Sequence, residues 1–185
     1  MKKQWKIEVE DWTEINIDAA LFIFTEADKF LKHTIENRDR TSKRGSTFLL
    51  IMLSIATAIA GYTFNEFSKN QEFSSTVIIN ALYLICILPV IYSLVRLISP
   101  GVYYFNGREP KEIAIPAYLS NRLLPQKYAY LALVNCEISA CQARIEYNLA
   151  QNRDRLYKLG KAIKYMVVTA IMYIAITVIN IILLQ

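Results

Sequence analysis

The stretch FSSTVIINALYLICILPVIYSLV, residues 73–95, contains 23 residues and no charged side chain. At about 1.5 Å per residue, a helix of this length measures about 34 Å, enough to cross a hydrocarbon layer of about 30 Å. Residues 45–65 and 165–185 form two further uncharged runs of similar length. Because backbone amides in lipid must pair within their own segment, all three runs are predicted to be helices. The sequence therefore predicts an all-α integral membrane protein with three transmembrane helices.

The positive charges are distributed unevenly between the polar segments. Of the 21 Lys and Arg residues, nine precede the first span, one lies between spans one and two, and eleven lie between Arg96 and Lys164. The positive-inside rule then predicts a cytoplasmic N-terminus, a cytoplasmic segment 99–164 and an external C-terminus. The predicted organisation is a cytoplasmic amphipathic helix region (1–44), a transmembrane hairpin (45–98), a cytoplasmic turn-rich segment with a long helix (99–164) and a third span (165–185).

A helix is predicted from about residue 16, with Asn16 or Asp18 as its N-cap. Its apolar residues fall into two stripes, and a helix that is apolar on so much of its circumference must lie between neighbours, in the same chain or in another. The first stripe contains Ala20, Phe24, Ala27, Leu31 and Ile35, and the second contains Ala19, Phe22, Ile23 and Phe30. The helix leads into a basic block formed by Arg38, Arg40, Lys43 and Arg44.

Small residues recur every four positions in the first span, as in Ser54 and Ala58 or Thr57 and Gly61. Such spacing lets two helix backbones approach closely, so this span is predicted to pack against protein as well as lipid. The second span contains Pro89, which removes one backbone hydrogen bond and is expected to kink the helix.

The segment after the second span is rich in turn signals and aromatic residues. Asn106-Gly107 is a strong turn dipeptide, and a compact turn-rich segment, with a small hairpin as one alternative, is predicted here. Aromatic faces beside cations suit a nucleotide or single-stranded nucleic acid, although tyrosines near a membrane also form ordinary interfacial belts. The candidate ligand-binding residues are Arg38, Arg40, Lys43, Arg44, Tyr103, Tyr104, Phe105, Arg108 and Lys111.

From residue 126 onward the apolar residues recur at steps of three and four, which predicts one helix of nearly sixty residues that continues into the third span. The repeat is heptad-like, with Asn152 as a polar position that fixes register. We interpret this face as the contact surface of a homo-oligomer, with a tetramer favoured. The predicted seam contains Leu131, Val134, Ile138, Cys141, Ile145, Asn152, Leu156, Leu159 and Ile163.

Two asparagines lie within the apolar runs. Asn80 is seven residues from the start of span two, and Asn180 is five residues before Gln185, so both are expected about 8–10 Å below the same membrane surface. Paired within one subunit they would hold helices together; repeated around an oligomer they would line a pore. The candidate pore-lining residues are Asn80, Asn180 and Thr177.

The chain has no glycine-rich phosphate loop and no recognisable catalytic constellation, so an enzyme is not expected and no cofactor is predicted. Cys86 falls within a span. Cys136 and Cys141 fall on the predicted cytoplasmic side, where thiols stay reduced, and neither belongs to a Cys/His cluster that would bind a metal.

The order of parts resembles the small transmembrane effectors encoded beside nucleotidyltransferases in bacterial anti-phage operons. The resemblance lies in an amphipathic cytoplasmic helix, the exit Arg38-x-Arg40 followed by Lys43-Arg44, a small-residue transmembrane hairpin and a further helical element. The similar proteins include SLATT-type two-span effectors, CBASS membrane effectors and the nucleic-acid-gated channel of Hailong-type systems. The third span departs from the two-span form. The resemblance implies an oligomer that opens the bacterial inner membrane when a nucleotide signal binds.

The leading hypothesis is therefore a homo-oligomeric, ligand-gated ion channel or pore whose partners are the lipid bilayer, further copies of the chain and a nucleotide or oligonucleotide. The alternative is a structural or adaptor membrane protein that docks a cytoplasmic partner through helix 16–36.

Overall fold

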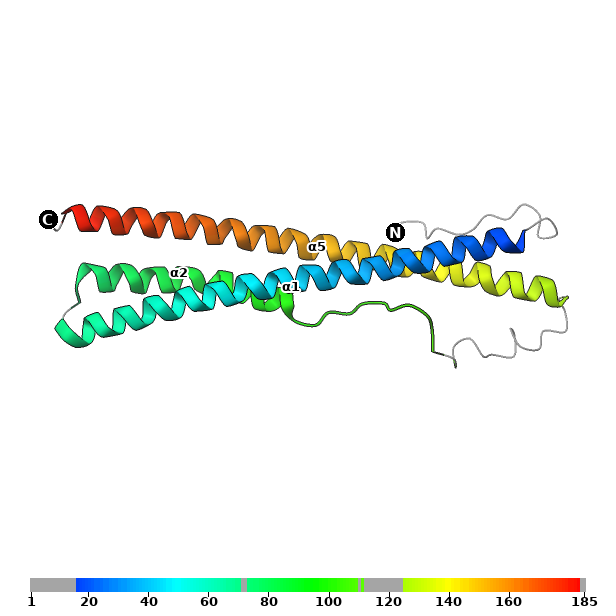
Figure 1. Cartoon of the computed structure of the whole chain (residues 1–185), viewed down its shortest axis with the longest axis horizontal. Helices are drawn as coiled ribbons and strands as arrows, with labels where there is room; N and C mark the ends of the chain where they lie inside the picture. The colour runs from blue at the N-terminus through cyan, green and yellow to red at the C-terminus, as the bar shows by residue number, and fades with distance from the viewer. Residues whose placement is uncertain (1–15, 71–72, 110, 112–124, 184–185) are drawn as a thin grey trace. The chain divides into compact units, whose positions relative to one another are not determined.

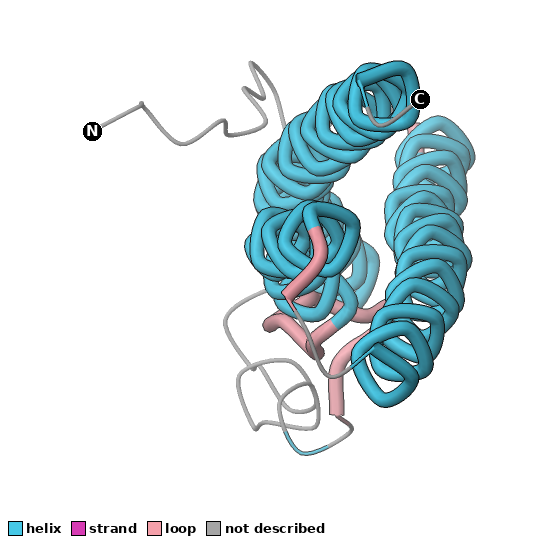
Figure 2. The backbone as a smooth tube through the Cα atoms, turned by 90° about the vertical axis from the view of Figure 1, so that its left-hand side faces the viewer, coloured by secondary structure: helices cyan, strands magenta, loops and turns pink. Residues whose placement is uncertain are grey.

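The computed structural model describes residues 16–70, 73–109, 111 and 125–183. Over these residues the regular structure is helical, and no strand occurs among them (Figure 2). The elements are α1 (Ile17–Asn70), α2 (Ser75–Ile98) and α5 (Gln126–Leu183), labelled in Figure 1. Each of the three contains a stretch long and apolar enough to cross a membrane. The prediction of an all-α chain with three possible spans is confirmed for the described residues.

The helix ends follow from local chemistry. Asn16 caps α1, because its Oδ1 accepts hydrogen bonds from the backbone N–H groups of Asp18 (2.9 Å) and Ala19 (3.4 Å). This settles the choice between Asn16 and Asp18. Ser74 caps α2 in the same way, its Oγ accepting from Val77 N at 3.3 Å. The helix runs through Pro89 and stops before Pro100-Gly101.

Two of the helices, α1 and α5, continue from a polar segment into an apolar stretch without a break. The helix predicted from residue 16 and the first span form one helix, α1, which continues to Asn70, five residues beyond the predicted end of that span at residue 65. The prediction of one helix from the region of residue 126 into the third span is confirmed, because α5 runs without a break through Gly160. Residues 100–109 are irregular, with a bend at Asn106-Gly107, and the remainder of the predicted turn-rich segment, 112–124, lies outside the described residues.

The chain divides into two compact units, the first formed by Met1–Arg38 with Val102–Asn152 and the second by Asp39–Gly101 with Arg153–Gln185. In the first unit α1 packs on α5. Ala20 contacts the layer of Leu131, Val134 and Ile138, while Leu31 contacts Cys141 and Ile145. The predicted first stripe is thus the contact face of α1. The second stripe contains Phe22, Ile23 and Phe30, and these side chains are 66%, 51% and 48% exposed.

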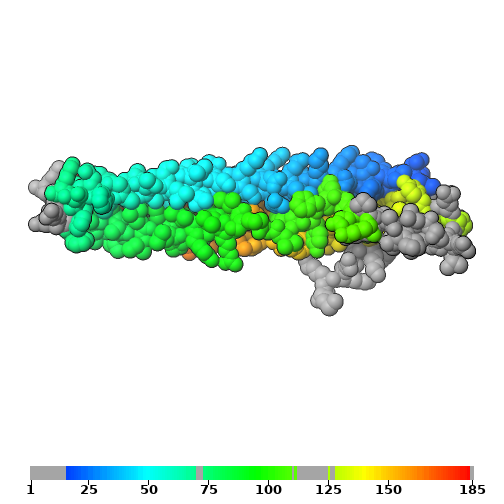
Figure 3. All heavy atoms as spheres, turned by 90° about the horizontal axis from the view of Figure 1, so that it is seen from below, coloured from blue at the N-terminus to red at the C-terminus, as the bar shows by residue number. Residues whose placement is uncertain are grey.

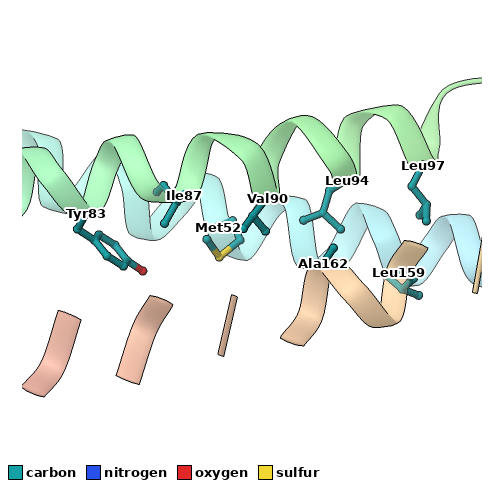
Figure 4. Packing of buried hydrophobic residues seen from close by; sticks show 8 residues of the cluster. All are labelled: Met52, Tyr83, Ile87, Val90, Leu94, Leu97, Leu159 and Ala162. Carbon is teal, nitrogen blue, oxygen red and sulfur yellow. The ribbon is translucent and has the colours of Figure 1, made fainter. Parts of the chain in front are cut away.

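The second unit is a three-helix bundle of the apolar stretches, with the spans of α1 and α2 side by side (Figure 3). Residues of α2 recur at steps of three and four, from Tyr83 to Leu97, and point toward Met52 of α1 and Leu159 and Ala162 of α5 (Figure 4). α1 and α2 approach closely at Gly45, where an added Cβ would lie 2.5 Å from Leu97 Cδ2. A side chain at this position would require the Leu97 side chain to move, which favours glycine.

Candidate functional site

The irregular segment 102–109 is held in the first unit by Asn148 of α5. The Asn148 side chain is fully buried, and its Oδ1 accepts from Tyr104 N at 3.2 Å while its Nδ2 donates to Tyr104 O at 3.0 Å. The same Nδ2 lies 3.1 Å from Thr34 Oγ1 of α1. One amide therefore pairs both backbone groups of Tyr104, much as a neighbouring strand would, and also ties α5 to α1.

Asn152, one helical turn further along α5, makes a second set of contacts. Its Nδ2 donates to Thr34 O at 2.7 Å, and its Oδ1 accepts from the Tyr103 hydroxyl at 2.6 Å. Arg38 of α1 lies over the Tyr103 ring, 4.8 Å from its centroid. We call Thr34, Asn148, Asn152 and Tyr103 the clasp. Because its buried polar groups are paired with one another, the clasp fixes the register of α1 and α5 and holds the segment against both.

The clasp changes the interpretation of the predicted ligand-binding aromatics. Tyr103 is 7% exposed and is covered by Arg38, so its ring is not an open stacking face. Tyr104 and Phe105 are 46% and 65% exposed, and the Tyr104 ring meets the Tyr147 ring edge-on at 5.0 Å. Of the three aromatics, Tyr104 and Phe105 therefore remain accessible to a base.

The candidate cations of this segment are engaged with acidic groups. Arg108 Nε lies 3.3 Å from Glu137 Oε1, and Lys111 pairs with Glu109. Arg144 Nη1 donates to Gly107 O at 2.9 Å, and Gly107 has a φ of 74°, a conformation that favours glycine. An anion at this place would have to compete with Glu137 for Arg108.

The other cations of the basic block belong to the second unit, where Arg40, Lys43 and Arg44 are exposed on α1. Of the nine predicted ligand-binding residues, Arg38, Tyr103–Phe105, Arg108 and Lys111 lie in the first unit. The structure joins Arg38 to Tyr103 directly.

The asparagines of the spans pair within the chain. The Tyr173 hydroxyl of α5 donates to Asn80 Oδ1 at 2.8 Å, and Asn180 Nδ2 lies 3.5 Å from Thr76 Oγ1 of α2. The sequence predicted Asn80 and Asn180 at the same depth in the membrane. Their hydrogen-bonded pairs are instead offset by about 6 Å along α2, because Asn80 and Thr76 are four residues apart on that helix. In this chain both asparagines join α2 to α5. This is the first of the two alternatives given by the sequence, in which the asparagines pair within one subunit and hold helices together. Thr177 lies on α5 between Tyr173 and Asn180. Its hydroxyl oxygen is buried and has no hydrogen-bond partner among the described residues.

The inward-facing side chains of the bundle change character along its length. On α2, the inward-facing side chains from Ile87 to Leu97 are apolar. They contact Met52 of α1 and Leu159 and Ala162 of α5. Beyond Tyr83, toward the loop that joins α1 and α2, the inward positions include the polar pairs of Asn80 and Thr76. The rings of Tyr83 and Tyr173, with centroids 4.3 Å apart, mark the boundary. Val77, which is also buried, lies between Thr76 and Asn80 on α2, so this half of the interior combines polar pairs with an apolar side chain, whereas the half from Ile87 to Leu97 is apolar.

The predicted oligomer seam is largely occupied inside the chain. Leu131, Val134, Ile138, Cys141 and Ile145 are buried against α1, Asn152 belongs to the clasp, and Leu159 and Ile163 pack in the second unit. Leu156 is 51% exposed. The heptad-like pattern is therefore explained by intrachain packing, and an oligomer needs another surface.

Sequence reasoning missed Thr34, Tyr173 and Arg155. Arg155 Nη2 lies 2.9 Å from Ser42 Oγ and 2.5 Å from Leu97 O, so it joins α5, α1 and the last turn of α2. A cation suits the partial negative charge at a helix C-terminus. The hydroxyl of Tyr173 is visible in the sequence within an uncharged run, but its pairing with Asn80 is not.

Thiol and metal chemistry are limited in the described part of the chain. Cys141 is buried, and burial, with smaller contributions from Asp28 and Glu137 against Arg144 and Arg108, raises the pKa of its thiol. Cys136 is exposed. No group of three or more His, Cys, Asp or Glu side chains that could hold a metal ion occurs among the described residues.

Comparison with known proteins returned no match for this chain among protein-family models, curated proteins or solved structures.

Proposed function

We propose that the chain is the subunit of an oligomeric, ligand-gated pore in the bacterial inner membrane, opened by a nucleotide or oligonucleotide in anti-phage defence. The observation that carries the proposal is the pair of polar contacts that Thr76 and Asn80 of α2 make with α5, in an interior that is otherwise apolar from Ile87 to Leu97. Amide groups within a membrane span are costly, and they commonly mark a path for water, ions or substrate.

The apolar half of the interior would act as the closed gate. Met52, Ile87 and Val90 are buried together, with exposed fractions of 1%, 1% and 4%. A constriction lined by such side chains excludes water and so blocks ions without a physical plug. Rearrangement of α2 against α1 and α5 would then open a path from the polar pairs of Asn80 and Thr76 across the span.

The ligand would bind at the segment held by the clasp. Tyr104 and Phe105 offer faces for stacking, and Arg108 offers a cation once Glu137 is displaced. This segment follows directly after α2 in the chain, so a change in its position pulls on the end of that helix. A near-complete switch requires the ligand to prefer the open form by about 5.5 kcal/mol, which several charge-assisted contacts repeated over subunits can supply.

Assembly would use the exposed face of α1 in its span. Ser54, Thr57, Ala58 and Gly61 are exposed, and an added Cβ at Gly61 would meet nothing within 4 Å. The hydroxyls of Ser54 and Thr57 donate to the carbonyls of Leu50 and Leu53, at 2.9 and 2.8 Å, so they carry little penalty in lipid. This face supports close packing of a second copy in the same membrane.

A flux assay on purified protein in liposomes tests the pore. Met52→Ser with Val90→Ser should hydrate the gate and give ion flux without ligand, because both side chains line the apolar half. The matched control is Ile85→Ser, which changes a 62% exposed residue of the same helix and should leave the liposomes tight. Equal flux from both variants, or from neither, would refute the gate.

The adaptor remains the second candidate, and the exposed residues Phe22, Ile23 and Phe30 favour it. They form an apolar surface on α1 in the first unit, of the kind that receives a partner protein. If the adaptor is correct, Phe22→Ser with Phe30→Ser should abolish the cellular phenotype of the protein. The gate variant, Met52→Ser with Val90→Ser, should then have no effect on that phenotype.

A further inference from the structure

A pocket of about 120 Å³ lies between α2 and α5 in the second unit. Its lining is almost entirely apolar and it is half open at the side of the bundle. It is lined by Ile79, Leu82, Tyr83, Cys86, Thr169, Met172, Tyr173 and Ile176. An apolar cavity of this order in a protein stays dry and takes up small hydrocarbons. Because the pocket lies within the uncharged stretches of both helices, the molecules that reach its opening are the acyl chains of the bilayer.

The face of each helix that lines the pocket continues to a cation. On α2, Leu82 and Arg96 are fourteen residues apart, which is two heptads, so they share one side of the helix. On α5, Met172 and Tyr165 are seven residues apart, and Lys161 Nζ lies over the Tyr165 ring at 5.9 Å from its centroid. Arg96 and Lys161 therefore flank the same groove at the end where the apolar stretches stop.

The distances match one leaflet of a membrane. Cys86 is ten residues from Arg96, and Thr169 is eight from Lys161, so the near end of the pocket lies about 12–15 Å along the helices from the two cations. Half of a hydrocarbon layer of about 30 Å is about 15 Å. A lipid whose phosphate contacts the cations would thus place the end of an acyl chain in the pocket.

The charge at this end of the bundle is strongly positive. In the second unit it contains nine Lys and Arg residues against Asp39 and Asp154, and Asp154 already pairs with Lys158. Arg96 and Lys161 are exposed, and neither forms an ion pair with a carboxylate of the described residues. Such a surface attracts anionic headgroups, and each added cation near a membrane surface strengthens that attraction.

We propose that the groove between α2 and α5 binds one anionic phospholipid from the leaflet next to Arg96, with its phosphate on Arg96 and Lys161 and an acyl chain in the pocket. Tyr165 covers the junction between headgroup and chain, as interfacial tyrosines do. This site does not depend on the pore, because it requires only that the three apolar helices span a membrane.

The headgroup is tested by native mass spectrometry of the purified protein with phosphatidylglycerol against phosphatidylcholine. Arg96→Gln with Lys161→Gln should weaken phosphatidylglycerol binding by about 30-fold, since two cations are lost. The matched control, Lys43→Gln with Arg44→Gln, removes two exposed cations from α1, which lines no part of the pocket. Equal weakening by both pairs would show a diffuse surface charge and overturn the site.

The acyl chain is tested in nanodiscs with phosphatidylglycerol that carries a photoactivatable diazirine near the end of its chain. Adducts should concentrate on residues 79–86 and 169–176 and be lost in Ile176→Phe, which fills the pocket. Leu82→Phe fills it from α2, and far-UV circular dichroism of both variants verifies folding. Ile174→Phe places the same side chain on the same helix at a residue that does not line the pocket, and should retain the adducts. Adducts spread evenly over exposed residues such as Ile85, or kept in both filling variants, would overturn the proposal.

Discussion

Replacing Asn148 by leucine should release the segment 102–109. Leucine has the same number and branching of side-chain heavy atoms as asparagine but makes none of its three hydrogen bonds, to Tyr104 N, Tyr104 O and Thr34 Oγ1. At about 1 kcal/mol net for each, the loss is about 3 kcal/mol. The equilibrium constant for opening of the segment should therefore rise about 150-fold, since about 1.4 kcal/mol changes an equilibrium constant by a factor of ten.

Hydrogen exchange measured by mass spectrometry in nanodiscs reports this opening directly. Peptides that cover residues 102–109 should exchange about 150-fold faster in Asn148→Leu, and the part of α2 around Val90 should keep its wild-type rate. Gln142→Leu is the matched control, because it removes an amide of the same helix whose contact, with Glu146, is exposed. If Asn148→Leu exchanges like the control, the clasp does not hold the segment and the reasoning fails.

Three further predictions address other parts of the chain. Gly45→Val should destabilise the bundle by about 1–3 kcal/mol in denaturant titrations, because the new side chain would overlap Leu97; an unchanged midpoint would rule out the close approach. At pH 8 a maleimide should label Cys136 but not Cys141 until the protein unfolds, since burial raises the pKa of the Cys141 thiol and leaves less of the reactive thiolate; equal labelling of both would contradict this. A reporter of cytoplasmic location should be active when fused after residue 111 and silent after Gln185, and activity at both would remove the predicted N-in, C-out topology.

The spans and the contact face of α1 were predictable because charge-free length and apolar spacing report burial or lipid exposure directly. Ala20 and Leu31 lie on a buried contact face of α1, as their spacing predicted, and the structure shows that this face packs against α5. The same spacing says nothing about which chain supplies the partner, so the residues from Leu131 to Ile145 were assigned to an oligomer although α1 covers them.

The candidate site was less predictable, because its contacts join residues far apart in the sequence. Tyr103 and Tyr104 look alike in a one-dimensional pattern, yet one is buried under Arg38 and the other is exposed. Asn80 and Asn180 were identified as unusual from the apolar runs around them. Their partners Tyr173 and Thr76 follow only from the packing of α2 on α5.

The hydrogen bond from Asn152 Nδ2 to Thr34 O joins residues 118 apart in the chain, and this has a consequence for biosynthesis. At about 5–20 residues per second, α1 leaves the ribosome roughly 6–24 seconds before its partner on α5 has been made. During that interval Ala20 and Leu31 have no partner to cover them, while α1 and α2 can already pair through Gly45 and Leu97. The transmembrane hairpin is therefore expected to assemble first, and the nascent chain presents a bare apolar helix to chaperones until translation is nearly complete.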